Sequence, residues 1–146
     1  MTGFVTLRIT GQGLILQEIT DKLGRYPDYS YKKGDVYTSK RSGRRIVYKE
    51  DAWLSEVKNK EGESLENCIE QFVLSFCYVA DYLKALATKF DVCIWISAFS
   101  ESEQSNVHLS EHTIVALCAI GASVDVNVMF LEDFYNGTYR EKEAPK

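Results

Sequence analysis

Basic side chains are concentrated in one short segment of this 146-residue chain. Residues 25–49 carry eight Lys or Arg against two Asp, a local charge of +6, whereas the whole chain has a net charge of −4. The other 121 residues therefore sum to −10. Charge separated in this way indicates a partner or a packed acidic neighbour, and the chemistry it offers is binding of an anion or of an acidic protein surface.

Within this segment the turn Lys32-Lys33-Gly34 is the best binding candidate, because glycine allows a close approach to the backbone. Arg44 and Arg45 would add charge to a site at Lys33. Either Trp53 or Trp95 would then provide a stacking surface for a planar ligand.

The same basic residues have a structural interpretation that needs no ligand. Lys and Arg on a two-stranded ribbon often keep an edge strand from pairing with other chains. That role would account for Lys40, Arg41, Arg44 and Arg45. The sequence leaves both interpretations open.

Catalytic motifs are absent from the chain. It has no phosphate-binding Gly-x-x-x-x-Gly-Lys-Ser/Thr loop and no Gly-x-Ser-x-Gly elbow. His108 and His112 have a spacing that could bind zinc on one helix, but Ser110 as a helix cap would place His108 outside that helix. We therefore predict no catalytic residue, metal or cofactor, although residues of a hydrolase could still converge only in space.

A second candidate surface follows from alternating strands. If the Val and Ile side chains of the predicted strands face helices, the opposite face presents mixed aromatic and polar groups, typical of a recognition surface. These are Thr6, Arg8, Trp95, Ser97, Phe99, Asp125, Asn127 and Met129. The alternative is that hairpins between residues 29 and 57 fold over this face and make Trp95 and Phe99 a second small core.

The elements that must position these residues can be read from periodicity. Residues 4–10 alternate as a strand, residues 16–23 form a short helix ended by Gly24, and residues 29–57 read as strands with turns. A stripe from Leu65 to Phe90 predicts one continuous helix of about seven turns, begun by Ser64. A strand at 92–99, a helix from Ser110 to about 120 and a strand at 124–131 follow.

This order predicts an α+β fold with helices packed on one face of a mainly antiparallel sheet, and we prefer a ferredoxin-like core. We expect one domain over residues 1–136, followed by a polar tail at 137–146. No apolar run approaches the roughly 20 residues of a membrane span, and the N-terminus does not resemble a signal peptide. The four cysteines form no Cys-x-x-Cys pair and lie in apolar stretches, which indicates buried, reduced thiols in the cytoplasm.

Short motifs in a fixed order resemble a bacterial family known as domain of unknown function 4279. They are Leu-Gly-x-x-Pro at 23–27, Lys33-Gly34-Asp35, the Arg44 and Arg45 pair, Trp53, Phe99-Ser100-Glu101, Asn-x-x-Leu-Ser at 106–110 and a final Val-Asp-Val-Asn-Val strand. Tyr31 stands where the resemblance predicts Trp. The resemblance spans roughly residues 5–130 and implies a fold, but no established activity.

Two functions are consistent with these features. The first is a non-catalytic binding protein, for example an immunity-type partner of a toxin, whose acidic remainder could steer a basic toxin domain. The second is a pocket for a small anionic, nucleotide-like ligand. The acidic net charge argues against nucleic acid and membrane as partners, and the oligomeric state is not determined by the sequence. The candidate binding residues are Lys33, Arg44, Arg45, Trp53, Arg8, Trp95 and Phe99.

Overall fold

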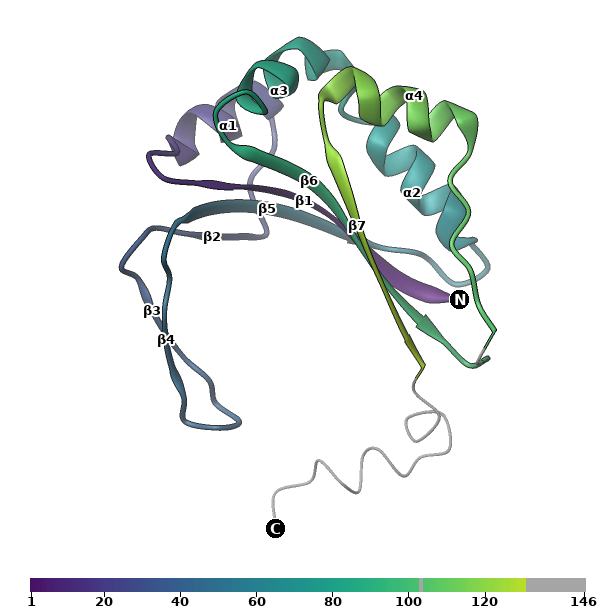
Figure 1. The fold of residues 1–146 in the computed structure, drawn as a ribbon, viewed down its shortest axis with the longest axis horizontal. Helices are drawn as coiled ribbons and strands as arrows, with labels where there is room; N and C mark the ends of the chain where they lie inside the picture. The colour runs from purple at the N-terminus through teal and green to yellow at the C-terminus, as the bar shows by residue number, and fades with distance from the viewer. Residues whose placement is uncertain (103, 131–146) are drawn as a thin grey trace.

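The computed structural model describes residues 1–102 and 104–130, and it is an α+β fold as the sequence predicts (Figure 1). The predicted polar tail at 137–146 lies outside the described residues. The elements in chain order are β1 Thr2–Gly11, α1 Leu16–Leu23, β2 Tyr29–Tyr31, β3 Val36–Thr38, β4 Arg45–Val47, β5 Asp51–Lys58, α2 Leu65–Leu74, a 3₁₀ turn Cys77–Val79, α3 Ala80–Leu86, β6 Asp91–Ser100, α4 Glu111–Ile120 and β7 Ser123–Phe130.

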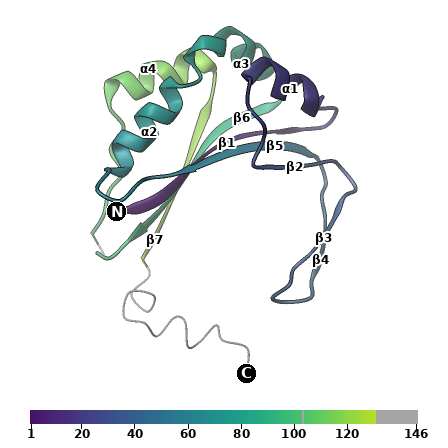
Figure 2. The ribbon, with the colours of Figure 1, turned by 180° about the vertical axis from the view of Figure 1, so that it is seen from behind.

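One mixed sheet forms the body of the domain, in the strand order β2-β5-β1-β6-β7. The helices all cover one face of this sheet, and the other face is curved and concave (Figures 1 and 2). Strand β1 lies at the centre, and its Val5, Leu7 and Ile9 are fully buried against the helices. The strict alternation of β1 therefore produces the two faces that the sequence predicts.

The ferredoxin-like detail of the prediction is not confirmed. Strand β1 pairs antiparallel with both of its neighbours, β5 and β6. The parallel pair is β6 with β7, and α4 connects these two strands. The sheet is thus antiparallel except at one edge, where a β-α-β crossover adds the last strand.

The single long helix predicted from Leu65 to Phe90 is wrong, because the chain turns between α2 and α3. The Ser75 hydroxyl donates to the Phe72 carbonyl at 2.5 Å, and the Phe76 amide bonds to Val73, three residues back. Such bonds compete with the i−4 pattern and tighten the chain into a 3₁₀ turn. Phe76 and Leu83 are nevertheless buried, so the apolar stripe is preserved across the turn.

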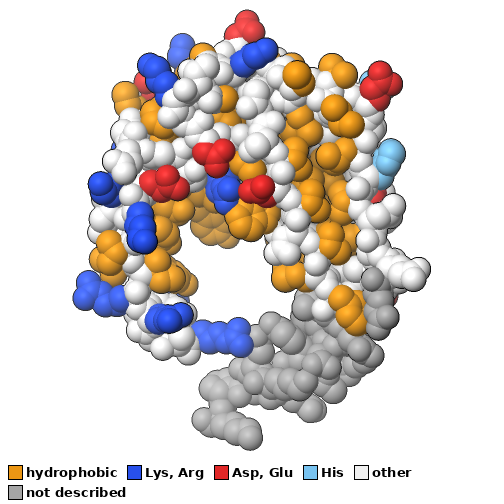
Figure 3. All heavy atoms as spheres, in the orientation of Figure 1, with side chains coloured by type: hydrophobic (Ala, Val, Ile, Leu, Met, Phe, Trp, Pro, Cys, Tyr) orange, Lys and Arg blue, Asp and Glu red, His pale blue; other side chains and the backbone are white. Residues whose placement is uncertain are grey.

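The short strands β3 and β4 form a ribbon that we call the arm, residues 36–47. It is paired only within its own two-stranded sheet and projects from the β2–β5 side of the domain (Figures 1 and 2). The alternative in which hairpins fold over the open sheet face is therefore wrong. Instead, the arm borders that face, and the surface is hollowed between the arm and β7 (Figure 3).

The four cysteines are free, but they are not all buried as the sequence indicated. Cys68 and Cys93 are buried, whereas Cys77 and Cys118 are exposed. Burial raises the pKa of the Cys68 thiol, with a smaller contribution from Glu63, and burial is also the main reason that the pKa of Cys93 is raised. Both effects reduce the thiolate fraction, and only the thiolate reacts with disulfide reagents.

Titration of native protein with an aromatic disulfide reagent should therefore modify two thiols quickly, and all four only after unfolding in denaturant. The double substitution of Cys77 and Cys118 by serine should remove the fast phase. A fast phase that persists in this variant would show that Cys68 or Cys93 is accessible.

No helix among the described residues is both long and apolar enough to cross a membrane.

Candidate functional site

The open face of the sheet is built from the strand positions that alternate with the core. In the pairing register, Thr6 lies between Glu56 of β5 and Trp95 of β6, and Trp95 in turn pairs with Asp125 of β7. The eight residues that the sequence assigns to this face lie at such positions: Thr6, Arg8, Trp95, Ser97, Phe99, Asp125, Asn127 and Met129. The structure thus brings Arg8, Trp95 and Phe99 onto one surface.

Arg8 occupies the centre of this face and is held on several sides. Its guanidinium Nη2 lies 3.3 Å from an Asp125 carboxylate oxygen and 3.9 Å from Asp91. Its guanidinium carbon lies 4.5 Å from the centroid of the Trp95 ring, a cation–π contact. Two carboxylates therefore compensate the Arg8 charge, and a free anion would compete with both of them.

One polar atom of Arg8 remains unsatisfied within the described part of the chain. Its Nε is buried and has no hydrogen-bond partner there, although the side chain as a whole is 21% exposed. A buried donor without a partner costs roughly 1–3 kcal/mol. The centre of the open face therefore retains one unsatisfied donor beside an aromatic ring.

The far end of the open face is apolar and aromatic. The rings of Phe4 and Phe99 pack edge to face, with centroids 6.2 Å apart, and Phe99 pairs with Met129 on the neighbouring strand. The Lys58 ammonium lies 5.8 Å from the centroid of the Phe4 ring. The face is thus charged at its centre and apolar at the end where Phe4, Phe99 and Met129 lie. Such a mixture is common in protein interfaces.

The predicted Lys32-Lys33-Gly34 turn is anchored to the body of the domain by Asp51. One carboxylate oxygen of Asp51 accepts the Lys33 amide at 2.8 Å, and the other accepts the amides of Gly13 and Leu14 at 2.9 and 3.1 Å. The Lys32 ammonium lies 3.9 Å from this carboxylate and bonds the Leu14 carbonyl. Asp51 therefore joins two loops and the start of β5.

These bonds explain the protonation behaviour of Asp51. The Lys33 amide, followed by those of Gly13 and Leu14 and the nearby Lys32 ammonium, lowers the pKa of the Asp51 carboxyl, although burial opposes the shift. Sequence reasoning missed Asp51, because a lone Asp after a basic segment carries no motif.

Gly34 shapes the Lys32-Lys33-Gly34 turn. It has a φ of 92°, which requires glycine, and a Cβ there would meet no other atom within 4 Å. Its role is therefore in the turn geometry.

Trp53 is a core residue, and its predicted role as a stacking surface is wrong. It pairs with Ile9 on β1, faces the helices and has no exposed surface. Its indole N–H donates to the Thr20 hydroxyl oxygen of α1 at 3.1 Å. No ligand could reach the ring without unfolding this part of the domain. The Lys33, Arg44, Arg45 and Trp53 group is therefore not one site.

Arg44 and Arg45 lie on the arm and are exposed. Arg45 pairs with Thr38, and the Arg44 carbonyl accepts the Ser39 amide at 2.9 Å, so their backbones close the ribbon. The arm carries four Lys or Arg and no Asp or Glu. Lys33 is likewise exposed, at the base of the arm. The other two basic residues of the arm, Lys40 and Arg41, are exposed as well.

Tyrosines line a pocket of about 660 Å³ where the arm meets the sheet. The Tyr31 and Tyr48 rings are stacked with centroids 3.6 Å apart, and Tyr29 and Tyr37 complete the aromatic lining. Burial raises the pKa of Tyr31, as do Tyr48 and Glu50, while the nearby Arg8 opposes the shift. Sequence reasoning singled out only Tyr31 of this stacked pair, because Tyr48 comes from the other end of the hairpin.

No group of three or more His, Cys, Asp or Glu in residues 1–102 and 104–130 is arranged to hold a metal ion. The candidate site in the described part of the chain consists of an open sheet face, a tyrosine pocket and a basic arm.

Comparison with known proteins gives a family and no activity. A family model described as a domain of unknown function, DUF4279, matches residues 1–131. No curated protein and no solved structure matches the chain. Because the match covers all but the last 15 residues, this chain belongs to the DUF4279 family.

Proposed function

We propose that the chain is a non-catalytic binding protein that holds a protein partner between the arm and the open sheet face. The observation that carries this proposal is the surface of the arm. Its cross-strand pairs Val36–Val47 and Tyr37–Ile46 lie on opposite faces of the ribbon, and each of these side chains is 47–54% exposed. A two-stranded ribbon is marginally stable alone in water, and these apolar pairs would be covered by a partner.

Edge protection explains only part of this surface. Lys and Arg can keep an edge strand from aggregating, but that role gives no reason for exposed apolar pairs on both faces of the ribbon. Basic and apolar side chains together fit a protein surface that is acidic around an apolar centre. The proposed partner therefore meets the basic arm, rather than the acidic remainder of the chain that could attract a basic toxin.

A small anionic ligand is less well supported by the same geometry. The aromatic group nearest to the basic arm is the tyrosine pocket, and its lining contains Asp35 but no Lys or Arg. Arg8, the cation at the centre of the open face, is already paired with two carboxylates. A protein partner remains the better proposal. In an immunity-type role in the bacterial cytoplasm, that partner would be a toxin with an acidic surface rather than a basic one.

The arm can be tested by charge reversal. Affinity capture from nuclease-treated lysate of the source organism, followed by mass spectrometry, should recover a partner with the native chain. The double substitution Arg44→Glu and Arg45→Glu should reduce recovery by about tenfold or more, which corresponds to about 1.4 kcal/mol or more of binding free energy. Phe99→Ala on the open face should also reduce recovery of the same partner.

A matched control changes the same amount of charge elsewhere. The control is the double substitution Lys60→Glu and Lys84→Glu. Lys60 lies in the connector before α2 and Lys84 on α3, both away from the arm, so this variant should leave recovery unchanged. The proposal would be contradicted if the arm variant recovered as much partner as the native chain, or if the control variant lost as much as the arm variant. Recovery of the partner only from lysate that had not been treated with nuclease would also contradict it. Repeated capture of no protein would contradict it as well.

A further inference from the structure

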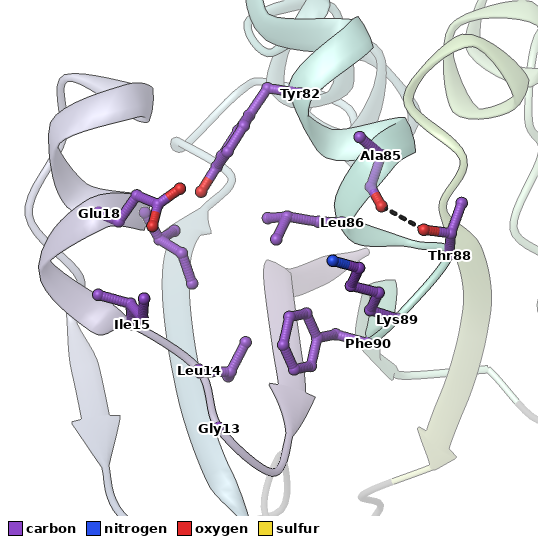
Figure 4. Close-up of a pocket in the computed structure, with 11 residues that line it drawn as sticks. Gly13, Leu14, Ile15, Glu18, Tyr82, Ala85, Leu86, Thr88, Lys89 and Phe90 are labelled. Carbon is purple, nitrogen blue, oxygen red and sulfur yellow. Dashed lines mark hydrogen bonds between the residues drawn. The ribbon is translucent and has the colours of Figure 1, made fainter.

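A separate pocket of about 450 Å³ lies in the helical layer, between α1 and α3 (Figure 4). It is formed by the loop that enters α1 and by the residues that leave α3. Helices α1 and α3 lie on the face of the sheet opposite the open face and the arm (Figures 1 and 2), so the pocket that their residues line is on the helix side. Its volume is at the small end of the range for ligand pockets.

Two side chains of opposite charge face each other across this pocket. Glu18 projects from α1 beside the Tyr82 hydroxyl, and the Lys89 ammonium points into the pocket from the other wall (Figure 4). Among the described residues neither charge has a hydrogen bond or an ion pair within 4.0 Å. The two charges therefore do not neutralise each other directly, and both are available to a ligand.

The surfaces between the two charges are apolar. Leu14 and Ile19 are 2% and 1% exposed, and they form a wall together with Leu86 and Phe90. Burial and the Glu18 charge raise the pKa of Tyr82, so its hydroxyl stays protonated and can donate or accept a hydrogen bond. The Thr88 hydroxyl already donates to the Ala85 carbonyl at 2.6 Å, which leaves its oxygen as an acceptor.

We propose that this pocket binds a small apolar zwitterion of the α-amino acid class. The ligand ammonium would lie between Glu18 and the Tyr82 hydroxyl, its carboxylate would meet Lys89, and its side chain would cover Leu14, Leu86 and Phe90. A simple anion would face the uncompensated Glu18, and a simple cation would face Lys89. Only a ligand that carries both charges can pair with Glu18 and with Lys89 at the same time. Charge-assisted hydrogen bonds of this kind are stronger than those between neutral groups.

The ligand side of the proposal can be tested with a matched series of compounds. Titrations of the full chain are followed by ¹H–¹⁵N NMR with L-leucine, 4-methylpentanoate, which lacks the ammonium, and 3-methylbutylamine, which lacks the carboxylate. Leucine should shift the amides of Leu14, Tyr82, Leu86 and Phe90 in a saturable way. Each truncated compound should bind about tenfold more weakly or worse, as expected when a charge-assisted hydrogen bond is lost. Glycine should bind weakly because it lacks the apolar group.

The second test of the proposal changes the protein, with one substitution for each of the two charged residues. Glu18→Gln should weaken leucine binding by about tenfold without weakening 4-methylpentanoate, and Lys89→Met should weaken leucine without weakening 3-methylbutylamine. Glu61→Gln and Lys60→Met, in the connector before α2, are matched controls that should change nothing. All four positions are exposed, so the spectra should show intact folds.

The proposal is overturned if leucine gives no saturable shifts up to about 10 mM, well above a millimolar Kd. It is also overturned if both truncated compounds bind as well as leucine, or if Glu18→Gln and Lys89→Met leave leucine binding unchanged. Because the arm and the open face are not involved, these results do not depend on the outcome of the capture experiment.

Discussion

Replacing Trp53 with alanine is expected to lower the free energy of unfolding by about 3–5 kcal/mol, the usual cost of removing a buried aromatic side chain. Trp53 has no exposed surface, and its ring fills the space between β5 and α1. The substitution also removes the indole donor to the Thr20 hydroxyl. Since domains of this kind are stable by about 5–15 kcal/mol, the variant would lose a large part of its stability.

Urea denaturation followed by far-UV circular dichroism measures this loss. Trp95→Ala is the matched control, because Trp95 is only half-buried on the open face and its removal should cost less. Trp53→Phe should also cost less than Trp53→Ala, since it keeps most of the buried area. If Trp53→Ala proved no more destabilising than Trp95→Ala, the assignment of Trp53 to the core would be incorrect.

The second large effect is expected at Asp51. Asn at this position keeps the size of the side chain, but it loses the negative charge and places an NH₂ group where the carboxylate accepts backbone amides. Asp51→Asn should therefore destabilise the fold far more than the same type of substitution at an exposed carboxylate, such as Glu61→Gln. Amide hydrogen exchange at Gly13, Leu14 and Lys33 should become faster, because the bonds that protect these amides are lost.

The pH dependence follows from the direction of the pKa shift. Because the folded-state pKa of Asp51 is lower than its unfolded value, its contribution to stability is complete above the unfolded pKa of about 4 and is lost as pH falls through the folded pKa. The difference in stability between the native chain and Asp51→Asn should therefore be largest near pH 7 and shrink toward pH 3. Urea midpoints measured across this range test it.

Glu61→Gln, at an exposed position, should show little such convergence. A difference between the native chain and Asp51→Asn that stays constant from pH 7 to pH 3 would mean that the carboxylate charge has no role in stability. The effect would then come from the shape of the side chain alone.

Local signals in the sequence were reliable wherever they depend on near neighbours. Ser64 and Ser110 cap their helices by accepting the amides of Asn67 and Thr113, as their positions before apolar runs predict. Gly24 and Gly121 end α1 and α4 in the left-handed conformation, with φ of 62° and 70°. Each of these features needs only three or four adjacent residues.

The long helix predicted from Leu65 to Phe90 is a feature that local patterns did not predict correctly. The apolar stripe from Leu65 to Phe90 has the same spacing on both sides of the 3₁₀ turn, so periodicity cannot reveal the break. The break depends on competing hydrogen bonds at Ser75 and Phe76 and on burial of the bent stripe against the sheet.

The sequence by itself determined the α+β class, the two faces of the central strands and the concentration of positive charge near the arm. These follow from alternation, capping and composition, which are local properties of the chain. The tertiary structure decided that Trp53 is core while Trp95 is half-exposed. Residues 51–55 do not alternate between apolar and polar types, so only their pairing with β1 fixes which way each side chain points.

The tertiary structure also decided which residues meet. Asp51 joins loops that are 18 and 37 or more residues away in the chain, and Glu18 faces Lys89 across more than 70 residues. Contacts between distant residues depend on how strands pair and helices pack, and a single sequence carries no local signal for them. For this protein the surfaces were therefore predictable in part, whereas the Asp51 junction and the α1–α3 pocket were decided by the fold.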